Sequence, residues 1–153
     1  MRCLGLDLGT KTLGLAISDK SNLIASPYKV LRWDGEDYSL LFNELDSIIR
    51  DNGITDLVLG LPKNMNNTLG FAAERSLNFK SALEERYKLE VHLIDERLST
   101  VEATNYLLDA DMSRKKRKKV VDGIAASIIL DTFLRKKGNK DYEWRKKRHI
   151  YDS

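Results

Sequence analysis

Three acidic residues, Asp7, Glu96 and Asp122, lie where an unpaired charge should be costly. Asp7 interrupts one short apolar run, Glu96 follows a second, and Asp122 lies at the start of a third. A buried carboxylate without a partner is strongly unfavourable or takes up a proton, so three of them indicate a shared cation. Ligand sets made only of carboxylate oxygens suit hard divalent ions. The sequence therefore predicts one metal site for one or two Mg²⁺ or Mn²⁺ ions, with the three acids as its ligands.

Each acid also has a simpler explanation. Asp7 could cap the turn that follows it, Glu96 could pair with Arg97 or cap a helix, and Asp122 could balance the lysines before it. Because all three explanations would have to apply together, the joint placement favours the metal site. Asp95 is a weaker fourth candidate, since strand alternation turns it away from the face that Glu96 uses.

The charge of the chain is unevenly distributed. Residues 1–113 carry 12 Lys and Arg against 18 Asp and Glu, whereas residues 114–153 carry 14 against 5. This asymmetry points to an anionic polymer, for which nucleic acid is the usual candidate. One uninterrupted basic run leads towards Asp122 and consists of Arg114, Lys115, Lys116, Arg117, Lys118 and Lys119. Such a run can be solvated surface, but beside a carboxylate cluster it is what a nuclease needs to hold phosphates.

The segments that must position the acids read as alternating strands and helices. Apolar runs of strand length cover residues 2–8, 13–18, 23–31, 57–61 and 91–94. Helical spacing of apolar residues covers about 39–51, 71–87 and 114–134. The first three runs, joined by turn-like residues, predict an antiparallel meander, and the later alternation implies parallel crossovers. Glu96 would then follow a strand at its carboxyl end, where open α/β sheets usually bind ligands.

Length and composition bound the remaining organisation. A chain of 153 residues fits one domain, taken as residues 1–137, followed by a basic tail over 138–153 for which mobility is expected. The single cysteine, Cys3, has no disulfide partner and is expected in the core. No signal peptide or membrane-length apolar run is evident, so a cytoplasmic protein without a membrane partner is expected.

Four motifs occur in order along the chain, at residues 4–19, Gly60–Met65, Asp95–Thr100 and Lys119–Ala126. Together they resemble the YqgF/RuvX family over roughly residues 1–135. The resemblance implies an α/β, RNase H-like fold with a mixed five-stranded sheet flanked by helices. It implies catalytic acids at Asp7, Glu96 and Asp122. It also implies a role in maturing the 5′ end of the precursor of small-subunit ribosomal RNA. Members of this family were earlier described as Holliday junction resolvases.

Two positions depart from the pattern of that family. Thr12 stands where the family commonly has arginine, and Asn66-Asn67 stand where a glycine is common. The lost arginine removes a phosphate contact, which affects substrate affinity more than chemistry. Lys11 is a candidate phosphate contact on the first hairpin, and Arg97 could either orient carboxylates or contact phosphate.

Three other functions stay open at this stage. A resolvase would act on branched DNA and should be a homodimer, because it cuts two symmetry-related strands. A non-catalytic RNA-binding assembly factor would gain nothing from acids that repel phosphate. The opening motif around Asp7 also resembles the phosphate-binding hairpin of the actin, Hsp70 and sugar kinase superfamily, but those proteins need a second lobe. The expected partner is therefore pre-rRNA, bound by a monomer or a homodimer.

Overall fold

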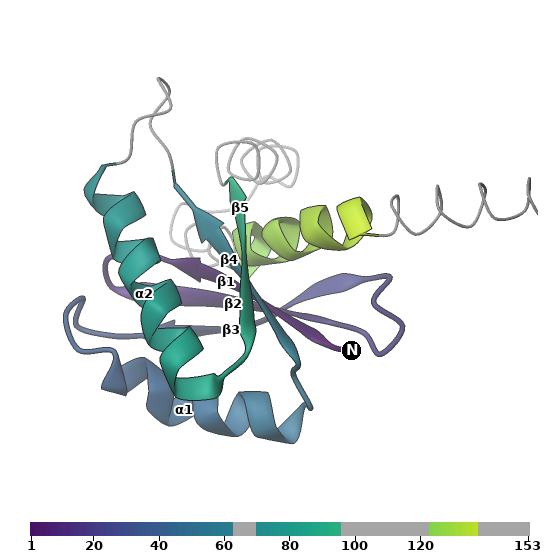
Figure 1. Cartoon of the computed structure of the whole chain (residues 1–153), viewed down its shortest axis with the longest axis horizontal. Helices are drawn as coiled ribbons and strands as arrows, with labels where there is room; N and C mark the ends of the chain where they lie inside the picture. Colours follow the sequence, from purple (N-terminus) through teal and green to yellow (C-terminus); the bar gives the residue numbers. More distant parts are fainter. Residues whose placement is uncertain (63–69, 96–122, 138–153) are drawn as a thin grey trace, which may run out of the picture.

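The structure is a computed structural model that describes residues 1–62, 70–95 and 123–137 of the chain. Its elements are, in order, β1 (Cys3–Leu8), β2 (Thr12–Ser18), β3 (Ala25–Arg32), α1 (Ser39–Asp51), β4 (Asp56–Leu61), α2 (Phe71–Tyr87) and β5 (Glu90–Asp95). A further helix covers residues 123–137 and is called the C-terminal helix below (Figure 1). None of the described helices is long and apolar enough to span a membrane.

The five strands form one mixed sheet in the order β3-β2-β1-β4-β5. β1, β2 and β3 pair antiparallel as a meander. β4 and β5 are added in parallel to β1 through the crossover helices α1 and α2. The expected α/β, RNase H-like topology with a mixed five-stranded sheet is therefore confirmed, and β1 lies at its centre.

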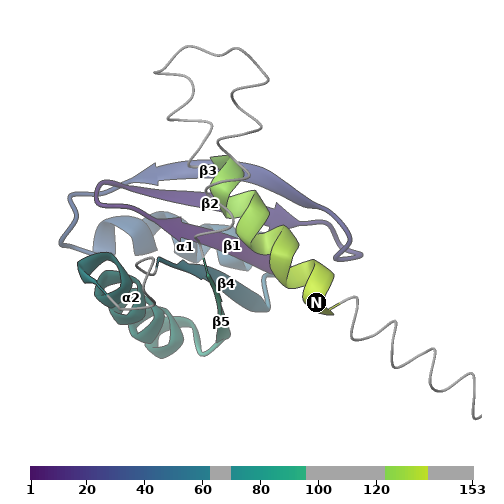
Figure 2. The same cartoon turned by 90° about the horizontal axis from the view of Figure 1, so that it is seen from above.

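Helices cover both faces of this sheet. α1 and α2 lie on one face and the C-terminal helix lies on the other (Figures 1 and 2). On the α1 and α2 face the core includes Leu4, Leu6, Leu57, Leu59, Phe79 and Leu83. On the opposite face it includes Cys3, Ala16, Val58, Ile94, Ala126, Ile129 and Leu130. Alternate residues of β1 and β4 thus enter different cores, as expected for strands buried on both sides.

Local signals explain where several elements end. α1 stops at Asn52 and Gly53, and Gly53 has a positive φ of 62°, which glycine adopts without strain. The third strand begins at Ala25 rather than at the expected Leu23. The reason is that the amides of Leu23 and Ile24 bind Asp19 Oδ1, at 2.8 and 3.1 Å, instead of a neighbouring strand.

The C-terminal helix extends past its expected end at residue 134 and continues to 137. Arginine and lysine are good helix formers. Arg135 also pairs with Asp131 one turn earlier, at 2.8 Å. The expected beginning of this helix, the turn near Asn66 and the tail over 138–153 lie outside the described residues.

Candidate metal and nucleic-acid site

Asp7 lies near the carboxyl end of the central strand. It pairs with Gly14 of β2 across the antiparallel ladder. Strand alternation places its side chain on the same face as Cys3 and Gly5, which is the face covered by the C-terminal helix. Asp7 is half-buried, and within the described residues no side chain or backbone amide is recorded as donating a hydrogen bond to its carboxylate. A carboxylate in this position favours a cation as its partner.

Gly5 allows the C-terminal helix to approach β1 closely. A Cβ added at Gly5 would lie 2.8 Å from the carbonyl oxygen of Ala126 and 2.9 Å from Cβ of Leu130. Such distances are shorter than packed atoms tolerate, so only glycine fits here. Ala125 and Ala126 on this helix are both buried, and the small side chains agree with its close approach to β1.

The direction of the C-terminal helix follows from three contacts. Gly123 faces Pro27 of β3, Ala126 lies over Gly5, and Lys137 donates to the sulfur of Met1. The helix therefore crosses the sheet obliquely towards the start of the chain (Figure 2). Of its two described ends, the one at residue 123 lies nearer to Asp7.

β5 ends at the same edge of the sheet as β1. Gly60 of β4 pairs with Ile94, and continuing the β1–β4 register by one residue places Asp7 level with Gly60. Asp7 and Ile94 are therefore two strands apart, roughly 10 Å between backbones. Ile94 packs in the core beneath the C-terminal helix. Asp95 is turned to the opposite face, which agrees with its weaker candidacy.

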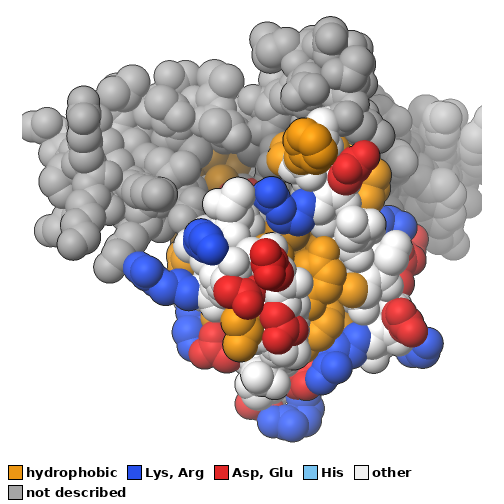
Figure 3. Space-filling model, turned by 90° about the vertical axis from the view of Figure 1, so that its left-hand side faces the viewer, with side chains coloured by type: hydrophobic (Ala, Val, Ile, Leu, Met, Phe, Trp, Pro, Cys, Tyr) orange, Lys and Arg blue, Asp and Glu red, His pale blue; other side chains and the backbone are white. Residues whose placement is uncertain are grey.

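Lys11 lies on the exposed hairpin that joins β1 to β2. Its ammonium Nζ donates to the backbone oxygen of Asp34 at 2.7 Å and keeps two further N–H donors. The side of the molecule that carries α2 shows lysine and arginine side chains interspersed with acidic ones (Figure 3). Lys11 is thus accessible to a ligand beside the Asp7 end of β1.

Most of the other predicted site residues lie outside the described part of the chain. They are Glu96, Arg97, Arg114, Lys115, Lys116, Arg117, Lys118, Lys119 and Asp122. Glu96 directly follows the last residue of β5, and Asp122 directly precedes the first described residue of the C-terminal helix. Their role as metal or phosphate ligands stays a prediction.

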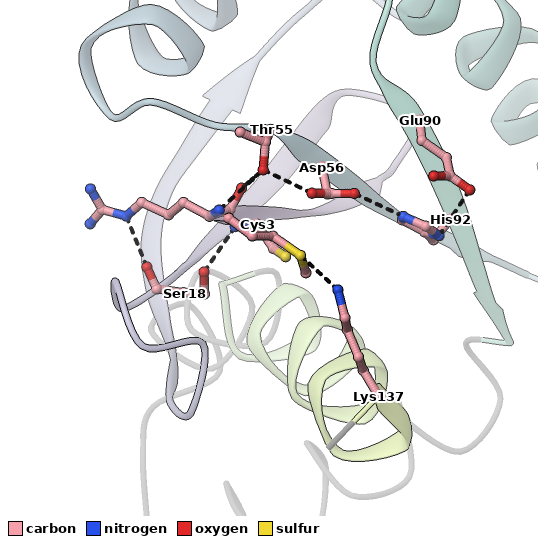
Figure 4. Close-up of polar contacts among 9 residues, drawn as sticks. Cys3, Ser18, Thr55, Asp56, Glu90, His92 and Lys137 are labelled. Carbon is pink, nitrogen blue, oxygen red and sulfur yellow. Dashed lines mark hydrogen bonds and ion pairs between the residues drawn. The ribbon is translucent and has the colours of Figure 1, made fainter. Parts of the chain in front are cut away.

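A second group that could hold a metal ion lies at the opposite end of the sheet. Asp56, Glu90 and His92 each offer a ligand atom, and these atoms lie within 4.8 Å of one another. His92 Nε2 is 3.2 Å from Asp56 Oδ1, and its Nδ1 is 3.9 Å from Glu90 Oε1 (Figure 4). His92 Nε2 can donate to Asp56 without any metal, so this contact does not require an ion.

The residues around this group hold it through a hydrogen bond and a packed ring. Thr55 Oγ1 donates to Asp56 Oδ2 at 2.8 Å, and the His92 ring packs on Phe133 of the C-terminal helix with 4.5 Å between centroids. Burial, aided by the charge of Asp56, raises the pKa of Cys3 to about 11. From the sequence, Glu90 and His92 can be placed on one face of a strand, but Asp56 joins them only through the β4–β5 register.

Comparisons with known proteins identify the family of this chain. The family described as "RuvX: Holliday junction resolvase" matches residues 1–136. A "Putative pre-16S rRNA nuclease" of Geobacillus kaustophilus is 51% identical over 136 residues, which cover 88% of this chain and 97% of that protein. A protein of the same description from Oceanobacillus iheyensis is 45% identical over 137 residues, covering 90% of this chain and 100% of that protein.

Solved structures show the same fold at low sequence identity. RuvC of T. thermophilus in complex with a Holliday junction substrate has a TM-score of 0.57 and 12% identity, over 90% of this chain and 96% of that chain. A fowlpox virus resolvase bound to Holliday junction DNA has a TM-score of 0.50 and 13% identity, over 89% and 98%. The family match over most of the chain and the relatives near half identity lead to one conclusion: this protein belongs to the RuvX family.

Proposed function

We propose that this protein is a metal-dependent nuclease that hydrolyses phosphodiester bonds in the maturation of the 5′ end of pre-16S ribosomal RNA. The observation that carries the proposal is Asp7, a half-buried carboxylate on the central strand without a donor among the described residues. Relatives at 45% and 51% identity carry the name of a pre-16S rRNA nuclease and match nearly their whole length.

The metal site of this proposal consists of Asp7, Glu96 and Asp122. Three features of the described residues support it: β5 ends at the edge of the sheet where Asp7 lies, Ile94 faces the C-terminal helix, and residue 123 is the helix end nearer to Asp7. By strand alternation Glu96 would share the face of Ile94. This chain connectivity supports the proposal that Glu96 and Asp122 lie near Asp7, and three carboxylates would form an all-oxygen donor set that fits Mg²⁺ or Mn²⁺.

Different residues of the chain would hold the metal ion and bind the substrate. When bound, the divalent ion would activate the attacking water and stabilise the charge that develops on the phosphate. Asp7 would hold that ion from a strand paired on both sides with neighbouring strands, which fixes the position of its backbone. Lys11, Arg97 and the basic run 114–119 would bind phosphates on either side of the scissile bond.

A Holliday junction resolvase is the second candidate, favoured by the description of the matching family and not by the residues themselves. The test is cleavage of a labelled RNA spanning the 5′ end of the small-subunit precursor, beside a four-way DNA junction, with Mg²⁺, Mn²⁺ or EDTA. We expect metal-dependent cutting of the RNA that is lost in Asp7→Asn. Cutting of the junction alone, by a dimer, would support the resolvase. Salt-dependent RNA binding without any cutting would support an assembly factor.

A further inference from the structure

The hairpin turn Gly9–Thr12 begins two residues after Asp7, and its tip is exposed. Within it, the amide of Gly9 donates to the carbonyl of Thr12 at 2.8 Å, and Thr10 and Lys11 are exposed. An exposed tip of this kind is expected to sample several conformations unless other contacts hold it. A turn that must bind phosphate in one geometry therefore needs contacts from elsewhere in the fold.

Those contacts come from the segment Trp33–Gly35, between β3 and α1. The backbone amide of Trp33 donates to the carbonyl of Lys11 at 3.1 Å, and its indole Nε1 donates to the carbonyl of Gly9 at 3.2 Å. In return, Lys11 Nζ donates to the carbonyl of Asp34 at 2.7 Å. Three hydrogen bonds thus join this segment to the two sides of the turn.

Gly35 brings the segment against the tip of the turn. It has a positive φ of 90°, and a Cβ at this position would lie 2.6 Å from the carbonyl oxygen of Thr10. Any side chain here would be strained and would also displace the turn. The segment therefore contacts the turn at Gly9, Thr10 and Lys11.

The segment is itself anchored in the core. The Trp33 side chain is only 6% exposed and stacks on Tyr38 with 5.5 Å between ring centroids, and Tyr38 packs on Phe79 of α2. Asp34 Oδ1 accepts the amides of Asp37 and Glu36 at 2.8 and 2.9 Å, and these bonds hold the pKa of Asp34 below its ordinary value. A buried aromatic stack and a rigid turn thus support an otherwise exposed hairpin.

We propose that Trp33–Gly35 is a clamp that holds the Gly9–Thr12 turn, and with it Lys11, in the geometry that binds substrate phosphate beside Asp7. Trp33 is then a positioning residue that acts through the hairpin. This inference rests on the proposed nuclease function for its substrate, but the contacts that define the clamp are independent of it.

The test compares two conservative variants of the same aromatic stack. Trp33→Phe keeps a ring against Tyr38 but removes the donor to Gly9. Tyr38→Phe removes a hydroxyl whose one hydrogen bond within the described residues is to the Arg75 carbonyl, at 3.5 Å. With the pre-16S 5′-end RNA as substrate, Trp33→Phe should raise KM about 3- to 10-fold with little change in kcat, the size of one lost hydrogen bond. Tyr38→Phe should leave both constants unchanged.

A double-mutant cycle separates positioning from a general loss of structure. Lys11→Ala should raise KM by itself, and adding Trp33→Phe to it should have a much smaller effect than in the unmodified protein, because both changes act through one turn. Gly35→Ala is the second clamp variant and should raise KM in the same way. If Trp33→Phe instead lowers kcat and leaves KM unchanged, Trp33 only maintains the fold, and the proposal is overturned.

Hydrogen exchange tests the clamp without relying on catalysis. In the free full-length protein, the amides of Thr10, Lys11 and Thr12 should exchange several-fold faster in Trp33→Phe than in Tyr38→Phe. If the unmodified protein cuts no RNA, the nuclease function fails, while faster exchange would still support the clamp. Unchanged exchange together with unchanged KM would overturn the clamp and leave the nuclease function standing.

Discussion

Carboxylates at the two ends of the sheet differ in the hydrogen-bond partners that the described residues provide. At the amino ends of β4 and β5, Asp56 is in contact with both Thr55 and His92, so its charge is met by the protein itself. At the carboxyl end of β1, Asp7 is half-buried, and the described residues place no donor on it. A folded chain normally satisfies a carboxylate that it removes from water. The difference supports our proposal that Asp7 is a metal ligand, whereas Asp56 contributes to stability.

The largest expected effect is the loss of cleavage in Asp7→Asn. Removing the charge that holds the catalytic ion should lower the rate of RNA cleavage at least about 100-fold, as for other groups that act on the transition state. The thermal stability of the metal-free variant should be equal to or higher than that of the unmodified protein, because an uncompensated charge is removed. Gel-based cleavage assays and metal-free thermal melts measure both, and full activity in Asp7→Asn would rule out the metal site.

Glu96→Gln and Asp122→Asn extend the same comparison to the other two proposed ligands. Each should reduce cleavage as Asp7→Asn does and leave RNA binding in EDTA intact, because no cation then depends on the carboxylate. Filter binding and cleavage rates measure the two properties separately. If one of these variants cleaves normally, that residue is not a ligand, and the site is smaller than proposed.

Gly5→Ala alters the helix that covers both ends of the sheet. The added methyl group would meet the Ala126 carbonyl and Leu130, so we expect a loss of about 1–3 kcal/mol in the free energy of unfolding, typical of overpacking. The displaced helix should also weaken Mn²⁺ binding, since its residue-123 end lies nearer to Asp7. Denaturant unfolding and metal titration measure these effects. Unchanged stability would mean that the helix is not seated as closely on β1 as described.

Asp56→Asn should give the opposite pattern to Asp7→Asn. The variant loses the charge that faces His92, so the free energy of unfolding should fall by about 1 kcal/mol. Metal-dependent RNA cleavage should be retained, because this group lies at the other end of the sheet. If Asp56→Asn folds but no longer cleaves, the catalytic metal would have to be assigned to the Asp56, Glu90 and His92 group.

Cys3 provides the smallest expected effect and reports on the amino end of the sheet. Burial raises its pKa to about 11, so almost no thiolate forms at pH 8, and the folded protein should resist alkylation that the unfolded chain undergoes. Because the pKa of Cys3 is higher in the folded than in the unfolded protein, the protonated thiol contributes to the stability of the fold. This contribution is complete below the unfolded pKa near 9 and is lost as the pH rises towards 11. Rates of alkylation, with and without denaturant, measure it. Rapid modification of the native protein would show that Cys3 is not buried.

Much of the fold could be predicted from the sequence because local patterns decide it. The apolar spacing predicts α1 and α2 at their observed bounds, and the apolar run over residues 2–8 predicts β1. The third strand was placed too early, since Leu23 and Ile24 read as strand residues although Asp19 binds their amides.

Contacts between distant segments could not be predicted in the same way. The clamp joins Trp33 to Gly9, and nothing local in either segment signals the other. The proximity of Asp56 to His92 depends on the β4–β5 register, which tertiary packing sets. Asp7 was identifiable because a charge within an apolar run is costly wherever the strand lies.

The most direct test of the difference between the two ends is paramagnetic broadening of backbone amide signals on titration with Mn²⁺. If the catalytic ion binds at Asp7, the signals of Leu6 to Gly9 and of Ile94 should broaden first, and this broadening should disappear in Asp7→Asn. Broadening that begins at Asp56, Glu90 and His92 and persists in Asp7→Asn would contradict the assignment of the metal to the carboxyl end of β1.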